Sequence, residues 1–417
     1  MSMLTPALLL WLTTGLVIQA SQIKSDVTMI YDANLRGTWK MTSNFTNPGP
    51  EVFGATSAQT RALTAKINEI GRVIHDTKVF NPPLGFEARA QARLFPFRAW
   101  WIPASECGPN IPSCREVPLI AELAVTLFDL FHYSDEPPSQ ARTNAEINLD
   151  AWFYINDLRI SLPMDSFGAG LADARPICLK PMIVKRAAGI PVYALAPGDG
   201  LGYLYFTNGR SPWVPVTCEQ FITSLIRKLG ADLDKQKAEP GQPEGEQHAS
   251  RAGAEERRKE IEKMYAGLEK DPVKRARLVE EALKAAAAKE AATAKSQAGA
   301  RQEVPDTDRT LIAPLRDELA RMTPAERASA AWYLKPADGR SGLVPAGTPN
   351  ARELVTLNVD YFDRSRPRSD IQLIVVMYNG QFTPQVLPNS GTAAIRLDEF
   401  IQTADWKRIA AFVQPAK

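Results

Sequence analysis

Four ionisable side chains stand close together in one short run, DLFHYSDE at residues 129–136. They are Asp129, His132, Asp135 and Glu136. An imidazole beside carboxylates is a set that can hold a metal ion or transfer protons. If the run is a strand, however, Asp129 and His132 point to opposite faces, because side chains alternate along a strand. We therefore predict no catalytic residue and no metal site.

The four cysteines are the second set with possible chemistry. They allow three pairings, and their spacing favours Cys107 with Cys114 and Cys178 with Cys218. The loop CGPNIPSC contains turn formers that let the chain double back. Closing the short and the long loop stabilises the fold by about 2–3 and about 4 kcal/mol, respectively. Neither a Cys-x-x-Cys redox motif nor a zinc-ligand spacing occurs, so we predict structural disulfides.

Aromatic and acidic residues leave a further possibility open. Trp100, Trp101, Trp152 and Tyr154 could stack on a sugar or an apolar ligand, although large rings at strand spacing are more often core residues. Carboxylate pairs that hydrolyse sugars can meet in space from distant strands. A hydrolase acting outside the cytoplasm, with an acidic site assembled from distant residues, is therefore the alternative function.

Recognisable catalytic and cofactor motifs are missing from the sequence. It contains no Gly-x-Ser-x-Gly elbow, no phosphate loop and no dinucleotide fingerprint. The glycines of APGDGLGYLYF are followed by a strand pattern, whereas a dinucleotide site needs a helix there. We predict no cofactor. The net charge of +2 also disfavours nucleic acid as a partner.

The first residues indicate export. An apolar run, ALLLWLTTGLVI at 7–18, precedes Ala20, so residues 1–20 are predicted to be a cleaved signal peptide. A retained anchor is the alternative, because no Lys or Arg precedes the run and Ile18 is large for its position. We expect a secreted or periplasmic protein without integral membrane insertion after cleavage. Glycosylation of the NFT triplet at Asn44 would require a eukaryotic secretory route.

Helix and strand patterns precede a long polar segment. Residues 57–78 predict an amphipathic helix capped at Thr56 or Ser57, in which the lone His75 is a packing or capping residue. Three ranges predict strands: 87–94, 117–133 and 147–162. A helix followed by adjacent strands indicates an α+β fold with antiparallel sheets.

Residues 203–229 combine a turn, a tryptophan, a cysteine and a basic helix. The run YLYF, Asn208-Gly209 and SPWVPV predicts a β-hairpin. Thr217 and Gln220 form the pattern of a capping box that starts a helix. Each residue has a structural role, so this region is predicted to be scaffold.

The composition then divides the chain into an N-terminal α+β domain at 21–232, a polar linker with Ala/Glu/Lys/Arg-rich helices at 233–306 and a C-terminal α+β region at 307–417. Within the middle part, Asp271-Pro272 predicts the start of a second helix. The helices at 254–298 are either a solvated spacer or an arm that binds another protein. The leading hypothesis is an exported, non-catalytic protein that binds a partner or ligand or acts as an envelope or extracellular scaffold.

Overall fold

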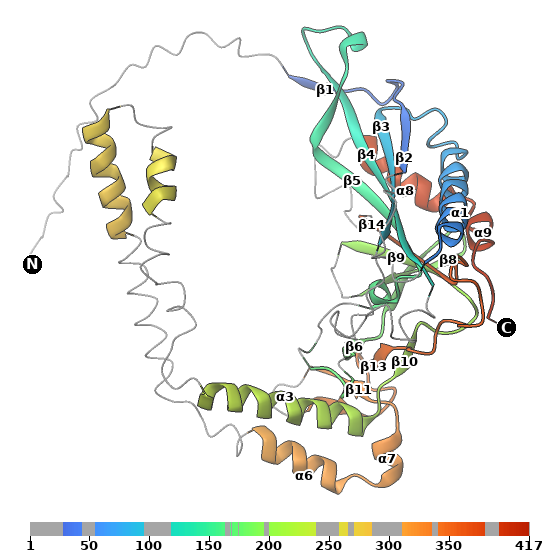
Figure 1. Ribbon diagram of the computed structural model, residues 1–417, viewed down its shortest axis with the longest axis vertical. Helices are drawn as coiled ribbons and strands as arrows, with labels where there is room; N and C mark the ends of the chain where they lie inside the picture. The colour runs from blue at the N-terminus through green and yellow to red at the C-terminus, as the bar shows by residue number, and fades with distance from the viewer. Residues whose placement is uncertain are drawn as a thin grey trace, which may run out of the picture.

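The computed structural model describes residues 28–43, 55–95, 118–162, 167, 169–173, 175–195, 200–238, 258–265, 271–285, 311–335, 341–379 and 392–416. In these ranges the chain has an α+β fold with two mainly antiparallel sheets and helices packed on them, as the sequence predicts (Figure 1). Several predictions fall outside the described residues: the signal peptide, Cys107, Cys114, Trp100, Trp101 and Asn44.

The larger sheet has nine strands. They are β1 (Met29–Tyr31), β2 (Trp39–Ser43), β3 (Phe86–Phe95), β4 (Ile120–Tyr133), β5 (Arg142–Ile155), β7 (Met182–Ala187), β8 (Ile190–Ala194), β9 (Leu201–Thr207) and β14 (Leu373–Asn379). Their order is β2-β3-β4-β5-β14-β9-β8-β7, and β1 pairs with the far end of β4. The β2–β3 pair is parallel and the other pairs are antiparallel.

The smaller sheet has five short strands. They are β6 (Cys178–Leu179), β10 (Trp213–Pro215), β11 (Trp332–Tyr333), β12 (Leu343–Val344) and β13 (Arg352–Leu357). The helices that pack on or beside the sheets are α1 (Ser57–His75), α3 (Cys218–Ala238), α6 (Ala313–Arg321), α7 (Pro324–Ala328), α8 (Thr392–Thr403) and α9 (Trp406–Ala410), with short 3-10 turns η1 (Pro138–Gln140) and η2 (Leu158–Ser161).

Helices α1, α8 and α9 cover one face of the larger sheet (Figure 1). The main core lies between these layers, where Ile67 and Phe400 from the helices meet Val125 and Phe153 from the strands. Alternation along β3 puts its alanines on this face, where they are buried. Because small side chains leave room for the helices, the helix layer packs closely on β3.

Helix α1 begins where the sequence predicts. Thr56 Oγ1 accepts from the Gln59 amide at 3.2 Å, and Gln59 Oε1 accepts from the Thr56 amide at 2.9 Å. This capping box satisfies two amides that would otherwise lack a partner at the helix start. The predicted apolar stripe, represented by Leu63 and Ile74, is buried.

The smaller sheet lies between the larger sheet and α3. One of its faces contributes Val355 and Leu357 to an apolar layer that includes Val375 of the larger sheet. Its other face contributes Leu354, which packs with Phe221 of α3. Helices α6 and α7 then pack beside α3 (Figure 1).

The predicted hairpin across Asn208-Gly209 is wrong, although its turn chemistry is right. Gly209 has a φ of 95°, a left-handed conformation that glycine tolerates. The flanking strands do not pair, because β9 pairs with β8 and β14, whereas β10 pairs with β13 in the other sheet. The turn therefore carries the chain from one sheet to the other. The capping box that follows is confirmed, with Thr217 and Gln220 bonded reciprocally at 2.9 and 3.2 Å.

The two ends of the chain share both sheets. Strand β14 lies between β5 and β9, and β13 pairs with β6 and β10. Residues 21–232 and 307–417 thus supply neighbouring strands of the same sheets. The predicted boundaries mark changes of composition along the chain, and the sheets extend across them.

The middle segment contains two described helices, at 258–265 and 272–285. Asp271 Oδ1 accepts from the amides of Val273 at 2.9 Å and Lys274 at 3.3 Å. Since Pro272 follows this cap directly, the predicted start of the second helix is confirmed.

Candidate functional site

The other face of β3, β4 and β5, which points away from α1 and α8, gathers charged and aromatic side chains that are exposed or half-buried. The pairing register sets them in three rows across the strands. The rows are Arg93, Glu122 and Tyr154; Gln91, Ala124 and Trp152; and Arg89, Thr126 and Asp150. We call these nine residues the acidic-aromatic face. None of them is fully buried.

Alternation is what brings these residues to one face. In β4, Leu123, Val125 and Leu127 enter the main core, so Glu122, Ala124 and Thr126 must point the other way. Directly paired side chains on one face lie about 4.5–5.5 Å apart at Cβ. Ala124, which has the smallest side chain of the nine, lies at the centre of the face and is paired directly with Trp152.

The carboxylates of this face are electrostatically disfavoured as anions. Burial raises the pKa of Glu122, and the charges of Asp157 and Asp150 raise it further, while Arg93 opposes the shift. Burial also raises the pKa of Asp150, opposed by a hydrogen bond from Thr126. Burial and these acidic neighbours raise the pKa of Tyr154 to about 12. A ligand that donates a hydrogen bond to either carboxylate, or that brings a positive charge near it, would therefore stabilise the ionised form.

Arginines frame one edge of the face. Arg89 Nε donates to Glu87 Oε1 at 2.7 Å, and the Arg89 guanidinium stacks 4.6 Å from the centre of the Phe128 ring. Arg93 donates to the side-chain oxygen of Gln91. Both arginine side chains are exposed, and the Arg89 guanidinium reaches the neighbouring strand β4 at Phe128.

The residues of the DLFHYSDE run do not converge. Asp129 points toward α8 and accepts from the Ala393 amide at 2.6 Å, with burial raising the pKa of its carboxyl. His132 Nδ1 instead lies 2.9 Å from the Tyr133 carbonyl oxygen and 3.1 Å from that of Glu136. Glu136 pairs with Arg142, and Asp135 is exposed. Asp129 thus contacts the start of α8, and His132 and Glu136 make contacts within the hairpin between β4 and β5.

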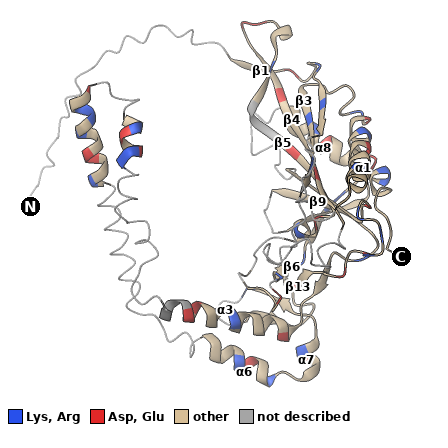
Figure 2. Cartoon of the chain, in the orientation of Figure 1, with Lys and Arg blue, Asp and Glu red and all other residues tan. Residues whose placement is uncertain are grey.

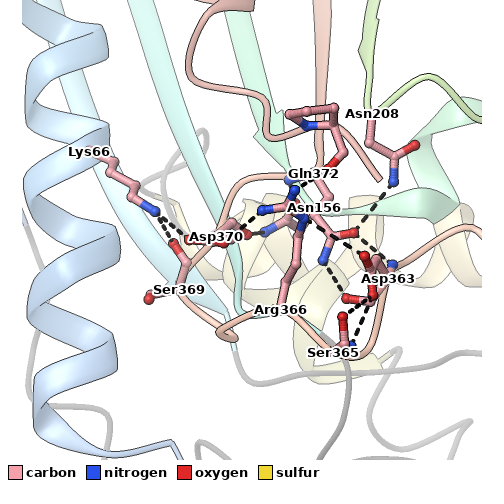
Figure 3. Close-up of polar contacts among 10 residues, drawn as sticks. Lys66, Asn156, Asn208, Asp363, Ser365, Arg366, Ser369, Asp370 and Gln372 are labelled. Atoms are coloured by element: carbon pink, nitrogen blue, oxygen red, sulfur yellow. Dashed lines mark hydrogen bonds and ion pairs between the residues drawn. The ribbon is translucent and has the colours of Figure 1, made fainter. Parts of the chain in front are cut away.

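A second polar cluster is centred on the loop between β13 and β14 (Figure 3). Asn156 is 1% exposed and has a φ of 56°. Its Nδ2 donates to the carbonyl oxygens of Leu119 and Asp370, both at 3.0 Å. Its Oδ1 accepts from the amides of Gln372 at 2.8 Å and Leu373 at 3.2 Å. One amide group thus uses its full hydrogen-bonding capacity to tie together β4, β5 and β14.

The rest of this cluster extends the tie to the second sheet. Gln372 Oε1 accepts from the Asp363 amide at 2.7 Å, and Gln372 Nε2 donates to the Asp363 carbonyl at 3.1 Å. Asn208 Nδ2 donates to the Tyr361 carbonyl at 3.1 Å. Lys66 Nζ contacts Asp370 Oδ1 at 2.9 Å (Figure 3). Because these polar groups satisfy one another, we interpret the cluster as a structural clasp.

Cys178 and Cys218 are not joined by a disulfide in the structure. Cys178 is buried with Val355 in the layer between the sheets, whereas Cys218 packs with Phe221 on the other face of the smaller sheet. Cys218 Sγ lies 3.6 Å from Ser329 Oγ. The predicted bond would require one of the two side chains to change faces, and this pairing stays a prediction.

Two negative findings apply to the described residues alone. No three His, Cys, Asp or Glu side chains there gather closely enough to hold a metal ion. In the same part of the chain, every helix is too short or too polar to cross a membrane.

Sequence reasoning identified Trp152 and Tyr154 but missed their acidic neighbours. Glu122 lies in the range 117–133, for which the sequence predicts only a strand, and Asp150 belongs to no motif. The usable signal in the sequence was the alternation of Glu122, Ala124 and Thr126 with the larger apolar residues at 123, 125 and 127. No protein-family model, curated protein or solved structure matches the chain.

Proposed function

We propose that this chain is an exported, non-catalytic protein that binds a hydroxyl-rich ligand, such as an oligosaccharide, on the acidic-aromatic face. The observation that carries the proposal is the register, which sets Glu122, Trp152 and Asp150 around the small Ala124. An aromatic ring offers a flat apolar surface with a polarised edge. Carboxylates accept hydrogen bonds from hydroxyls, and arginine and glutamine side chains donate them.

The alternative is a hydrolase, and one observation favours it. Glu122 is a carboxyl group with a raised pKa, which is the state that a general acid needs. Two features favour binding instead. Glu122 and Asp150 stand four residues apart in register, about 13 Å along the strands. Their pKa values are also shifted in the same direction, whereas an acid and a nucleophile need shifts that separate them.

A titration of the full chain tests this proposal. Cellohexaose, chitohexaose and maltohexaose are added while tryptophan fluorescence is followed. We expect at least one of them to bind. Trp152→Ala should weaken that binding about tenfold, which corresponds to about 1.4 kcal/mol. The joint change of Glu122→Gln and Asp150→Asn should weaken it by a smaller factor.

Trp332→Phe is the matched control, because Trp332 lies in the smaller sheet. It should leave the affinity unchanged. Equal losses in the Trp332 and Trp152 variants, or no response to any of the three sugars, would exclude the acidic-aromatic face as a sugar site. New reducing ends that appear with the wild-type chain and vanish with Glu122→Gln would establish the hydrolase instead.

Export is part of the proposal, and the first twenty residues support it by their pattern. The mature chain should begin at Ser21 in a secreted or periplasmic fraction, and its mass under non-reducing conditions should show Cys107 bonded to Cys114. A chain that retains residues 1–20, or that carries only thiols outside the cytosol, contradicts this part of the proposal.

We further propose that residues 254–298 bind another protein. The support is a groove between the two described helices, whose apolar residues are too few to bury the pair completely. Pull-down with the full chain and with a chain lacking 235–300 tests this role, since only the full chain should retain the partner.

A further inference from the structure

A groove of about 840 Å³ runs between the helices at 258–265 and 272–285. Its apolar floor comes from the second helix, where Ala276, Val279 and Leu283 recur at helical spacing. Its rim includes Lys259 and Lys263 from the first helix. The groove therefore has the form that accepts an amphipathic helix, with apolar residues inside and charges along the sides.

The two helices bury little apolar surface by themselves. Val279 is 6% exposed, but Met264 and Val273 are 59% and 78% exposed. A helix in a protein gains most of its stability from packing an apolar face against another element. A third helix laid on the Ala276, Val279 and Leu283 stripe would supply that packing.

The charges around the groove indicate the net charge of the segment that binds there. Four cationic side chains and two carboxylates line it, for a net charge of 4 − 2 = +2. One of these carboxylates, Glu262, is already paired with Arg258 at 3.0 Å. Figure 2 shows Lys and Arg on both helices. An occupant with carboxylates along its flanks would meet Lys259, Lys263 and Arg275.

We propose that this groove binds an acidic amphipathic helix of another protein, which completes a three-helix bundle with residues 258–285. The proposal rests on the partner role given above to residues 254–298 and specifies the chemistry of that partner. The bound helix presents an apolar stripe to the floor and Glu or Asp residues to the basic rim.

Binding of a synthetic helix to the full chain tests the proposal. The probe is a fluorescein-labelled 18-residue peptide with leucine at every a and d position and glutamate at every e and g position. We expect saturable binding that weakens about tenfold or more when Lys259→Glu and Lys263→Glu are combined. The same double variant should gain affinity for a peptide with lysine at e and g.

Arg277→Glu is the matched control, because Arg277 lies on the second helix but does not line the groove, and its side chain is 83% exposed. It should change the affinity less than twofold. Circular dichroism of each variant confirms that the helices are retained. No binding of the glutamate peptide, or an equal loss in the Arg277 variant, overturns the proposal.

Two further measurements separate the possible failures. Equal capture of the chain by phosphatidylserine vesicles, lost in the same double variant, would identify a lipid surface as the occupant and overturn the acidic helix. A partner could also bind the full chain and the double variant equally well but fail to bind the chain that lacks 235–300. This result would support a partner role for the segment and would overturn the proposed groove chemistry.

Discussion

At the residue scale, the polar side chains of this protein divide into those that satisfy one another and those that remain available. Asn156 and Gln372 belong to the first group, since their amide atoms are used within the clasp. Glu122 and Asp150 belong to the second, because burial raises the pKa of each carboxyl by more than the charge of Arg93 and the hydrogen bond from Thr126 lower it. This contrast is why we place ligand binding on the acidic-aromatic face.

Replacing Asn156 with alanine tests the clasp. The change leaves two buried amides and two carbonyl groups without their side-chain partner, so we expect Asn156→Ala to lower the free energy of unfolding by about 2–4 kcal/mol. Urea denaturation measures the loss. Asn350→Ala is the control, because Asn350 has a similar φ of 64° but is exposed, and it should cost less than about 1 kcal/mol. Similar losses in both variants would show that backbone conformation alone makes Asn156 important.

Asp129 provides a pH test of its structural role. Burial raises the pKa of its carboxyl, so the folded state binds the proton more tightly than the unfolded chain. The stability from this group is therefore complete below about pH 3.9 and is lost as pH rises through the folded pKa. Asp129→Asn keeps an oxygen for the Ala393 amide and does not titrate.

We expect Asp129→Asn to gain stability relative to the wild type as pH rises from about 4 toward neutrality. Asp129→Ala removes the acceptor and should cost about 1–2 kcal/mol at about pH 4, and this cost relative to the wild type should shrink as pH rises and the wild-type carboxyl ionises. Thermal unfolding across this range checks both expectations. An Asn variant with the same pH profile as the wild type would show that this carboxyl does not contribute to the profile.

At the element scale, local signals were predictable and long-range pairing was not. The capping boxes at Thr56, Thr217 and Thr323 involve residues three apart, so the sequence is enough to locate these helix starts. The partners of β9 and β10 depend on β13 and β14, which lie more than a hundred residues later. Likewise, the acidic-aromatic face depends on the register between β3, β4 and β5, which no single strand encodes.

Replacing Gly209, in the turn between the two sheets, or Gly230, in α3, with alanine should change the free energy of unfolding in opposite directions. A Cβ at Gly209 or Gly230 would meet no atom within 4 Å, so packing does not decide either case. Gly209 has a φ of 95°, and Gly209→Ala should destabilise the fold by about 1–2 kcal/mol. Gly230 lies inside α3, where alanine should stabilise it by about 0.5–1 kcal/mol. Urea denaturation of both variants measures the two changes in the free energy of unfolding. Destabilisation by Gly230→Ala would contradict the helical conformation of this residue in α3.

At the scale of the whole molecule, the regions before and after the middle segment form both sheets and the main core together. Strand β14 supplies the pairing between β5 and β9, and α8 and α9 supply much of the helix layer. A fragment of residues 21–306 would therefore lack the central strand β14 and the helices α8 and α9, which cover part of the main core. The helical segment at 235–300, in contrast, contributes only Val279 to the buried apolar residues described.

These differences predict the behaviour of three shortened proteins. Deleting 235–300 should change the melting temperature by less than about 4 °C, because little buried apolar surface is lost. Residues 21–306 expressed alone should show no cooperative unfolding, since β5 and β9 would expose unpaired central edges. Residues 21–234 and 301–417, expressed together as separate chains, should copurify because β14 completes the sheet between them. If the first fragment instead melts cooperatively alone and does not bind the second, the two regions fold independently and the shared sheet does not govern stability.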